Sequence, residues 1–168
     1  MIEDERHALK RQRKQEIISM QRLDTVTVIS RNTWYFLGIN SCQQMLYSLK
    51  RINEPLREHI GNSFQPLPSQ YHNHFLEMRN NVVSLYQRAL NMLSTGDFTN
   101  AEQLRKEGET LQLSIAEDRK QALDSIHSGT KNLNTLFLRI HIMQESQELI
   151  GCLRHMIRGM NKFAGGEG

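Results

Sequence analysis

The stretch EPLREHIGNSFQPLP, positions 54–68, interrupts a chain that has helical spacing almost everywhere else, and it contains all three prolines of the protein. Gly61 and Asn62 can adopt the left-handed backbone that ends a helix. Pro66 and Pro68 favour an extended chain before the next helix. Elsewhere the breaks are turns rich in Gly, Asp and Thr. The sequence therefore predicts several long helices that fold back on one another.

Composition supports one helical domain over residues 1–168. The hydrophobic content of 38% suits a single core. Leucine occurs twenty times and valine only four, and this bias favours helix over sheet. We expect an all-α fold, an elongated antiparallel bundle of four to five long helices. The net charge of +3 is mild and does not indicate nucleic-acid binding.

Cysteine content and hydropathy bear on the compartment. Cys42 and Cys152 lie in apolar helical contexts, so we expect two small buried thiols in a reducing environment. The N-terminus is charged and does not resemble a secretion signal. The longest apolar run, Trp34–Ile39, is far shorter than the ~20 residues of a membrane span. We expect a chain without a span that can still belong to a membrane protein.

The first segment, residues 2–23, is the most basic part of the chain. Its helix formers carry a thin apolar stripe, and its cationic side chains make one face available to solvent, to anionic lipid headgroups or to another protein. We expect a bend or connection at the β-branched patch 25–29. A long helix follows from about 32 to 60. Pro55 should kink it or end it early. Its predicted inward positions are Trp34, Leu37, Ser41, Met45, Leu49, Ile52, Leu56 and Ile60.

Three further helices are predicted. One runs from about Ser69 to Ser94, and Gly96 and a Thr99–Glu102 capping box form the following turn. The next helix ends before a reversal at Gly129 and Thr130. The last has the richest apolar face, so we expect it to be central, with a frayed tail at 165–168. The predicted inward residues of the three helices are Phe75, Val82, Tyr86, Ala89, Leu90 and Leu93; Ala101, Leu104, Gly108, Leu111, Ile115, Ala122 and Ile126; and Leu133, Leu136, Phe137, Ile140, Met143, Ile150, Leu153, Ile157, Met160 and Phe163.

Seven histidines raise the question of a metal or acid/base site. Di-iron bundles need Glu-x-x-His pairs on facing helices, and the sequence has none. His72 and His74 are two residues apart and fall on different sides of a helix. Glu54 and Glu58 share a face, but a solvated pair of carboxylates is the simpler interpretation. Phosphate loops, nucleophile elbows and zinc motifs are missing from the sequence. We expect neither an enzyme nor a metal or cofactor site.

The stretch 54–68 resembles a sequence motif of a known family. Six of its residues follow the P-x-x-E-H-x-x-N-x-x-x-P-L helix end and turn of certain bacterial phosphate transporters, of the PiT and Na/Pi-cotransporter types: Pro55, Glu58, His59, Asn62, Pro66 and Leu67. There it belongs to a cytosolic C-terminal domain resembling PhoU. Similar features follow in the same order: the turn 96–98, the pair Lys131–Asn132 and the segment 145–150. The resemblance covers roughly residues 30–163.

This resemblance implies a cytosolic accessory domain that regulates an inorganic phosphate transporter by protein–protein contact, at the inner face of the cell membrane. PhoU proteins bind metal clusters through repeated E/D-x-x-x-D motifs. Only Glu54 with Glu58 stands in a comparable frame here, so a metal cluster is not implied. The expected partners are the transmembrane part of a transporter or its regulators, with self-association as a further option. The candidate contact residues are Arg6, Lys10, Arg13, Lys14, Glu58, His59 and Asn62.

Two alternatives stay open. The same fold can serve as a free-standing regulator of phosphate uptake or signalling, as PhoU does. It can also be a metal-binding helical bundle, which metal analysis of protein purified without chelator would test.

Overall fold

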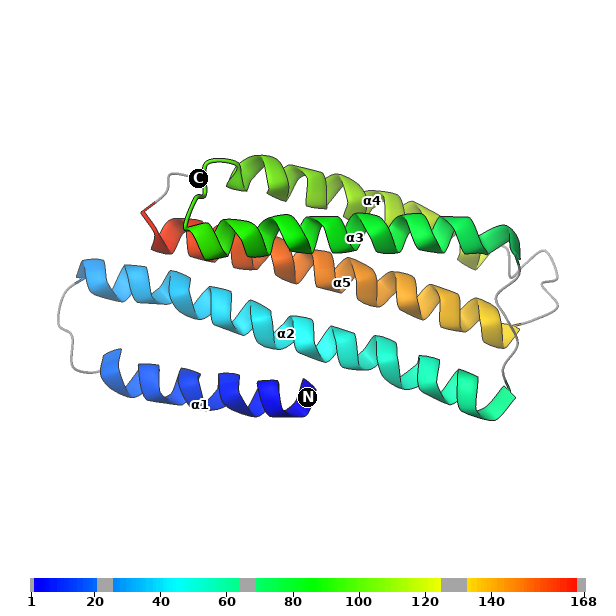
Figure 1. Ribbon diagram of the computed structural model, residues 1–168, viewed down its shortest axis with the longest axis horizontal. Coiled ribbons are helices and arrows are strands. Elements are labelled where there is room, and N and C mark those ends of the chain that lie inside the picture. The colour runs from blue at the N-terminus through cyan, green and yellow to red at the C-terminus, as the bar shows by residue number, and fades with distance from the viewer. Residues whose placement is uncertain (1, 21–25, 64–68, 125–132, 166–168) are drawn as a thin grey trace.

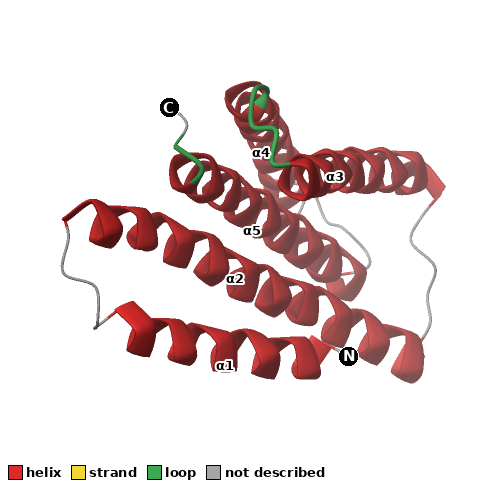
Figure 2. Cartoon of the chain, turned by 60° about the vertical axis from the view of Figure 1, so that its left-hand side comes forward, coloured by secondary structure: helices red, strands yellow, loops and turns green. Residues whose placement is uncertain are grey.

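The structure is a computed structural model that describes residues 2–20, 26–63, 69–124 and 133–165 (Figure 1). These residues form five α-helices and no strand, which confirms the predicted all-α class. The helices are α1 (Ile2–Met20), α2 (Val26–Ser63), α3 (Ser69–Thr95), α4 (Ala101–Asp124) and α5 (Leu133–Phe163). All run roughly along the long axis of an elongated bundle, and each is antiparallel to the preceding one (Figures 1 and 2).

The last helix, α5, is central, as predicted. It packs along α2 on one side and along α4 on the other, while α3 lies against α4 and α5 (Figure 2). The helix α1 packs on the outer side of α2. Ile150, Leu153 and Ile157 of α5 are almost completely buried. The hydrophobic core therefore follows α5 through the bundle, because this helix has apolar neighbours on several sides.

Glycines set the distance between α2 and α5. A Cβ atom built on Gly159 would lie 2.8 Å from the backbone oxygen of Trp34 and 3.1 Å from the backbone nitrogen of Gly38. These neighbours are main-chain atoms, which cannot move away as a side chain can. Only glycine at 159 permits this close approach, and the two helices pack tightly there.

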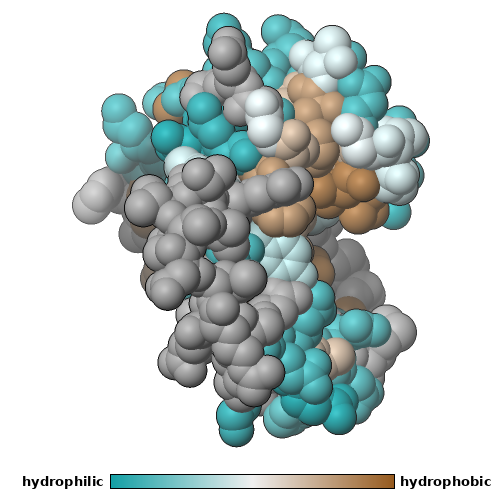
Figure 3. Space-filling model, turned by 90° about the vertical axis from the view of Figure 1, so that its left-hand side faces the viewer, coloured by the Kyte–Doolittle hydropathy of each residue, from teal (hydrophilic) through white to brown (hydrophobic). Residues whose placement is uncertain are grey.

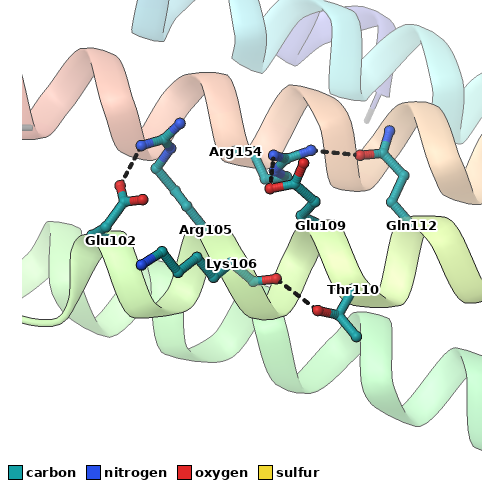
Figure 4. A network of polar contacts seen from close by, with 7 residues as sticks. All are labelled: Glu102, Arg105, Lys106, Glu109, Thr110, Gln112 and Arg154. Atoms are coloured by element: carbon teal, nitrogen blue, oxygen red, sulfur yellow. Dashed lines mark hydrogen bonds and ion pairs between the residues drawn. The ribbon is translucent and has the colours of Figure 1, made fainter.

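Polar contacts join α4 to α5. Gln112 and Gln147 bond reciprocally, since each amide nitrogen donates to the other residue's carbonyl oxygen, at 3.0 and 3.1 Å. Arg154 of α5 donates to the side-chain oxygen of Gln112 at 2.9 Å and pairs with Glu109 at 2.9 Å (Figure 4). These bonds fix the register of the two helices, because each has a definite partner and direction.

Some predicted boundaries are wrong. The patch 25–29 was expected to form a bend or connection, but Val26–Ile29 begin α2, because the weaker helix propensity of β-branched residues does not by itself prevent a helix. Gly61 and Asn62 do not end the helix with left-handed backbone, since neither has a positive φ and α2 continues to Ser63. Gly96 does, with φ of +68°, as predicted.

The predicted capping box at the start of α4 does not form. The hydroxyl of Thr99 donates to Oδ1 of Asp97 at 2.6 Å, and the Thr99 backbone N–H donates to the same oxygen at 3.0 Å. Both bonds hold the pKa of Asp97 below its usual value. Glu102 pairs instead with Arg105. An Asp97 turn therefore replaces the capping box, because the Thr99 N–H that Glu102 would have bonded is donated to Asp97.

Several residues predicted to point inward are exposed. They are Leu49, Ile60, Leu90, Leu133 and Phe137. The apolar spacing identifies the helices correctly but overstates how much of each face is covered. The predictions that concern Thr25, Pro66, Leu67, Pro68, Ile126, Gly129, Thr130, Lys131, Asn132 and residues 166–168 lie outside the described residues.

Candidate functional site at the α2–α5 end of the bundle

Pro55 lies inside α2, and the helix continues eight residues past it. A proline has no N–H, so the carbonyl of Arg51, four residues earlier, loses its helical donor. The Nε2 of His141, on α5, lies 2.9 Å from that carbonyl oxygen. A carbonyl can only accept, so Nε2 carries the proton and donates it. His141 therefore replaces the missing bond. Of the two outcomes predicted at Pro55, a kink or an early end of the helix, the early end is wrong.

Arg51 also forms an ion pair beside this bond. Its Nε lies 2.8 Å from Oε2 of Glu145, whose side chain is buried, and its Nη2 donates to Oγ of Ser48 at 3.0 Å. Removal of either partner would leave a charge without its complement, and for Glu145 that charge would be buried. Through His141 and Glu145, α5 holds the proline-containing turn of α2 at its backbone and at a side chain.

A groove of about 430 Å³ opens next to this junction. The α2 side contributes four residues with spacing i, i+3, i+4 and i+7, and the α5 side contributes four with the same spacing. The eight are Pro55, Glu58, His59 and Asn62 from α2, and Asn134, Phe137, Leu138 and His141 from α5. Two antiparallel helices thus present matching faces to one groove.

Phe137 gives the groove an apolar element. Its side chain is 54% exposed, whereas the sequence predicted it inward. The side chain is exposed because Phe137 lines the groove and is not part of the core. An exposed aromatic ring next to carboxylate, imidazole and amide groups is the composition of a protein contact surface.

The predicted contact residues fall in two separate places. Glu58, His59 and Asn62 line the groove together. Lys10 and Lys14 are exposed on α1, which lies beside the first half of α2 (Figure 1). Gln12 of α1 bonds to Tyr35 at 2.9 Å, and from position 35 to position 58 the helix rises about 35 Å. Arg6 and Arg13 belong to α1, and their side chains lie outside the described residues.

In each of the histidine and carboxylate pairs weighed from the sequence, one member has a protein partner. The Nε2 of His74 lies 3.1 Å from Oδ2 of Asp118, and Glu54 pairs with Lys50 at 3.6 Å. Across the ranges that the structure describes, no three His, Cys, Asp or Glu side chains gather as a metal ligand set. Cys42 and Cys152 are half-buried free thiols, and burial raises the pKa of each.

Sequence reasoning missed the α5 half of the groove. Asn134, Leu138 and His141 were assigned no role, although polar residues at 134 and 141 flank Phe137 with helical spacing. That spacing was the available signal. It could not show that this face of α5 meets Pro55, because the two positions are far apart in sequence and only packing brings them together.

Comparison of the chain with protein-family models, curated proteins and solved structures gives no match. None of the helices, over the residues described, combines the length and the apolar character that a bilayer crossing requires.

Proposed function

We propose that the chain is a cytosolic accessory domain that regulates a bacterial membrane inorganic phosphate transporter by protein–protein contact, without catalysing a reaction. The single observation that supports this proposal is the groove at the α2–α5 end. The four α2 residues that line it, Pro55, Glu58, His59 and Asn62, are four of the six residues in the stretch 54–68 that carry the family resemblance.

The composition of the groove favours contact over chemistry. Phe137 supplies an exposed aromatic anchor, and the surrounding polar groups can bond to a partner's backbone or side chains. The ion pair between Arg51 and Glu145 and the bond from His141 hold the groove walls in place. A preformed wall loses little conformational freedom on binding, which favours affinity.

A regulatory mechanism follows. A rigid bundle that binds one state of the transporter more tightly shifts the transporter toward that state. The basic helix α1, with Lys10 and Lys14 exposed, would lie toward the anionic headgroups of the inner membrane face. The groove would then meet the cytosolic loops of the transporter.

The test uses cells that express the chain together with the phosphate transporter encoded in the same genome. In one variant, benzoylphenylalanine replaces Phe137 as a photocrosslinker. In a second, Glu58→Ala, His59→Ala and Asn62→Ala are combined, and radiolabelled phosphate uptake is measured. A matched control combines Glu117→Ala, Lys120→Ala and Gln121→Ala on α4, away from the groove.

The proposal predicts a crosslink to the transporter and altered uptake with the groove variant alone. A crosslink to a soluble signalling protein, with no crosslink to the transporter, would favour the free-standing regulator. Unchanged uptake together with no crosslink to any protein would overturn the contact role.

A further inference from the structure

An apolar groove lies on another face of the bundle, between α2 and α3. The helix α3 packs against α4 and α5, while α2 stands apart from it (Figures 1 and 2). The groove has a volume of about 400 Å³. Ile142 and Leu149 of α5 lie at its base, Ile52 and Leu56 belong to the α2 wall, and the α3 wall is longer. That wall consists of His72, Phe75, Leu76, Met78, Arg79, Val82 and Val83.

Exposed apolar residues recur along α3 every seven positions. Leu76 is 42% exposed, Val83 43% and Leu90 59%. Leu76 and Val83 line the groove, and Leu90 continues the row beyond it. Figure 3, which looks onto the end where α3 finishes, shows apolar side chains at the surface on the side of α3. A seven-residue repeat is the spacing with which one helix packs lengthwise against another.

The charge content of α3 fits burial against a protein. Its 27 residues include only three charged ones, Glu77, Arg79 and Arg88, and Arg88 already pairs with Glu107 of α4. Interfaces between identical subunits are depleted of charge at their centre. The face of α3 that looks away from α4 therefore has the composition of an interface and not of a solvated helix.

We propose that the occupant is α3 of a second copy of this chain, in an antiparallel pair related by a two-fold axis at Val83. The row is symmetric about Val83, since Leu76 and Leu90 are each seven residues away. An antiparallel pair therefore places Leu76 of one copy on Leu90 of the other and brings the two Val83 residues together. This self-complementarity is what a two-fold interface requires.

The pairing also fits the charges and the available area. Arg79 of one copy falls opposite Gln87 of the other, so no like charges stand directly opposed. The helix α3 is about 40 Å long, so a strip about 10 Å wide along it covers about 400 Å² per subunit before the α2 wall is added. This area is below the roughly 800 Å² per subunit of a standard interface and fits a weak, reversible dimer. This interface is independent of the proposed transporter role.

The test places single cysteines in the row, in a background of Cys42→Ala and Cys152→Ala. Under mild oxidation, Val83→Cys should crosslink to itself. A mixture of Leu76→Cys and Leu90→Cys should form the mixed disulfide, while Leu76→Cys alone should not, because the two copies of position 76 would be about 21 Å apart. Crosslinking of Leu76→Cys alone, or of none of these, would overturn the antiparallel pairing.

Sedimentation equilibrium of the full chain tests the assembly itself. The wild-type chain should sediment as a dimer at micromolar concentration, and Val83→Glu should weaken the dimer at least tenfold while its helical circular dichroism is kept. Leu113→Glu is the matched control, because Leu113 is 66% exposed on α4, outside the row. A wild-type monomer at all concentrations, or equal weakening by Leu113→Glu, would overturn the proposal.

Discussion

The successive antiparallel helices α3 and α4 both lie against α5, yet they are held in different ways. The helix α4 has ten charged residues among its 24, and its buried side is fixed to α5 by the bonds of Gln112 and Arg154. The helix α3 has few charges and keeps an exposed apolar row. Specific polar partners fix the position of α4. The helix α3 also has polar partners, from Tyr86 to α5 and from Arg88 to α4, but its exposed apolar row leaves one face open to another partner.

The largest expected effect comes from placing a carboxylate in the core of the bundle, on α5, and comparing it with a carboxylate on the exposed face of α3. Ile150→Glu puts a carboxylate at a fully buried position of α5 and should lower the free energy of unfolding by about 4 kcal/mol or more, enough to unfold a marginal domain. Val83→Glu, on the open side of α3, should cost less than about 1 kcal/mol of monomer stability. Urea unfolding at a concentration too low for self-association measures both. Equal losses would contradict the central placement of α5.

The glycine contact between α2 and α5 gives the next effect. Gly159→Ala forces a Cβ against main-chain atoms of α2 and should destabilise the fold by about 1–3 kcal/mol. Gly61→Ala, also within a helix, meets open space and should stabilise by a few tenths to about 1 kcal/mol. Thermal unfolding of the two variants checks this difference in sign. A stabilising Gly159→Ala would mean that the helices do not approach closely there.

The bond from His141 to the Arg51 carbonyl is testable by a double-mutant cycle. His141→Phe should cost about 1 kcal/mol in the wild-type chain, because the carbonyl loses its donor. In a Pro55→Ala background the residue at 55 supplies its own N–H, so the same substitution should cost less. Denaturant unfolding of the four proteins gives the coupling free energy. A coupling of zero would show that His141 does not compensate for the proline.

The smallest effect concerns the attachment of α3 to α5. The Tyr86 hydroxyl donates to the Leu149 carbonyl at 3.0 Å, and burial raises the pKa of Tyr86 above its ordinary value of about 10. A raised folded-state pKa gives stability that is present below the unfolded pKa and is lost as the pH rises through the folded one. The wild-type chain should therefore lose stability above pH ~10.

The control for that prediction is Tyr86→Phe, which removes the titrating hydroxyl. This substitution should lower the free energy of unfolding by about 1 kcal/mol near neutral pH. It should also reduce the loss of stability that the wild-type chain shows at alkaline pH. Ultraviolet titration of the phenols, run beside unfolding at each pH, follows both. An ordinary pKa for Tyr86 would place its hydroxyl in water and detach that end of α3.

Apolar spacing and turn residues in the sequence predict the helices, and they also predict that the last helix is central. The apolar residues 136–163 identify α5 as central, and Gly96 identifies the turn between α3 and α4. How α2 continues past its interior proline could not be predicted, because the donor that replaces the missing N–H comes from His141, far along the chain. Leu49 and Ile60 were expected inward since spacing shows which side of a helix is apolar, but not whether a neighbour covers it.

Sequence reasoning predicted the α2 wall of the candidate contact site but not the α5 wall. Glu58, His59 and Asn62 share a helical face, so their convergence follows from spacing. The opposite wall of the groove, with Phe137, depends on how α5 packs beside α2. Spacing along one helix contains no information about the helix that faces it.

Native-state hydrogen exchange of the Val83→Glu chain tests most directly whether α5 is the fixed centre of the bundle and α3 its weakly held member. The amides of residues 143–157 should exchange only through global unfolding, and those of residues 72–83 should exchange at least a hundredfold faster through local opening. Equal protection of α3 and α5 would contradict the account.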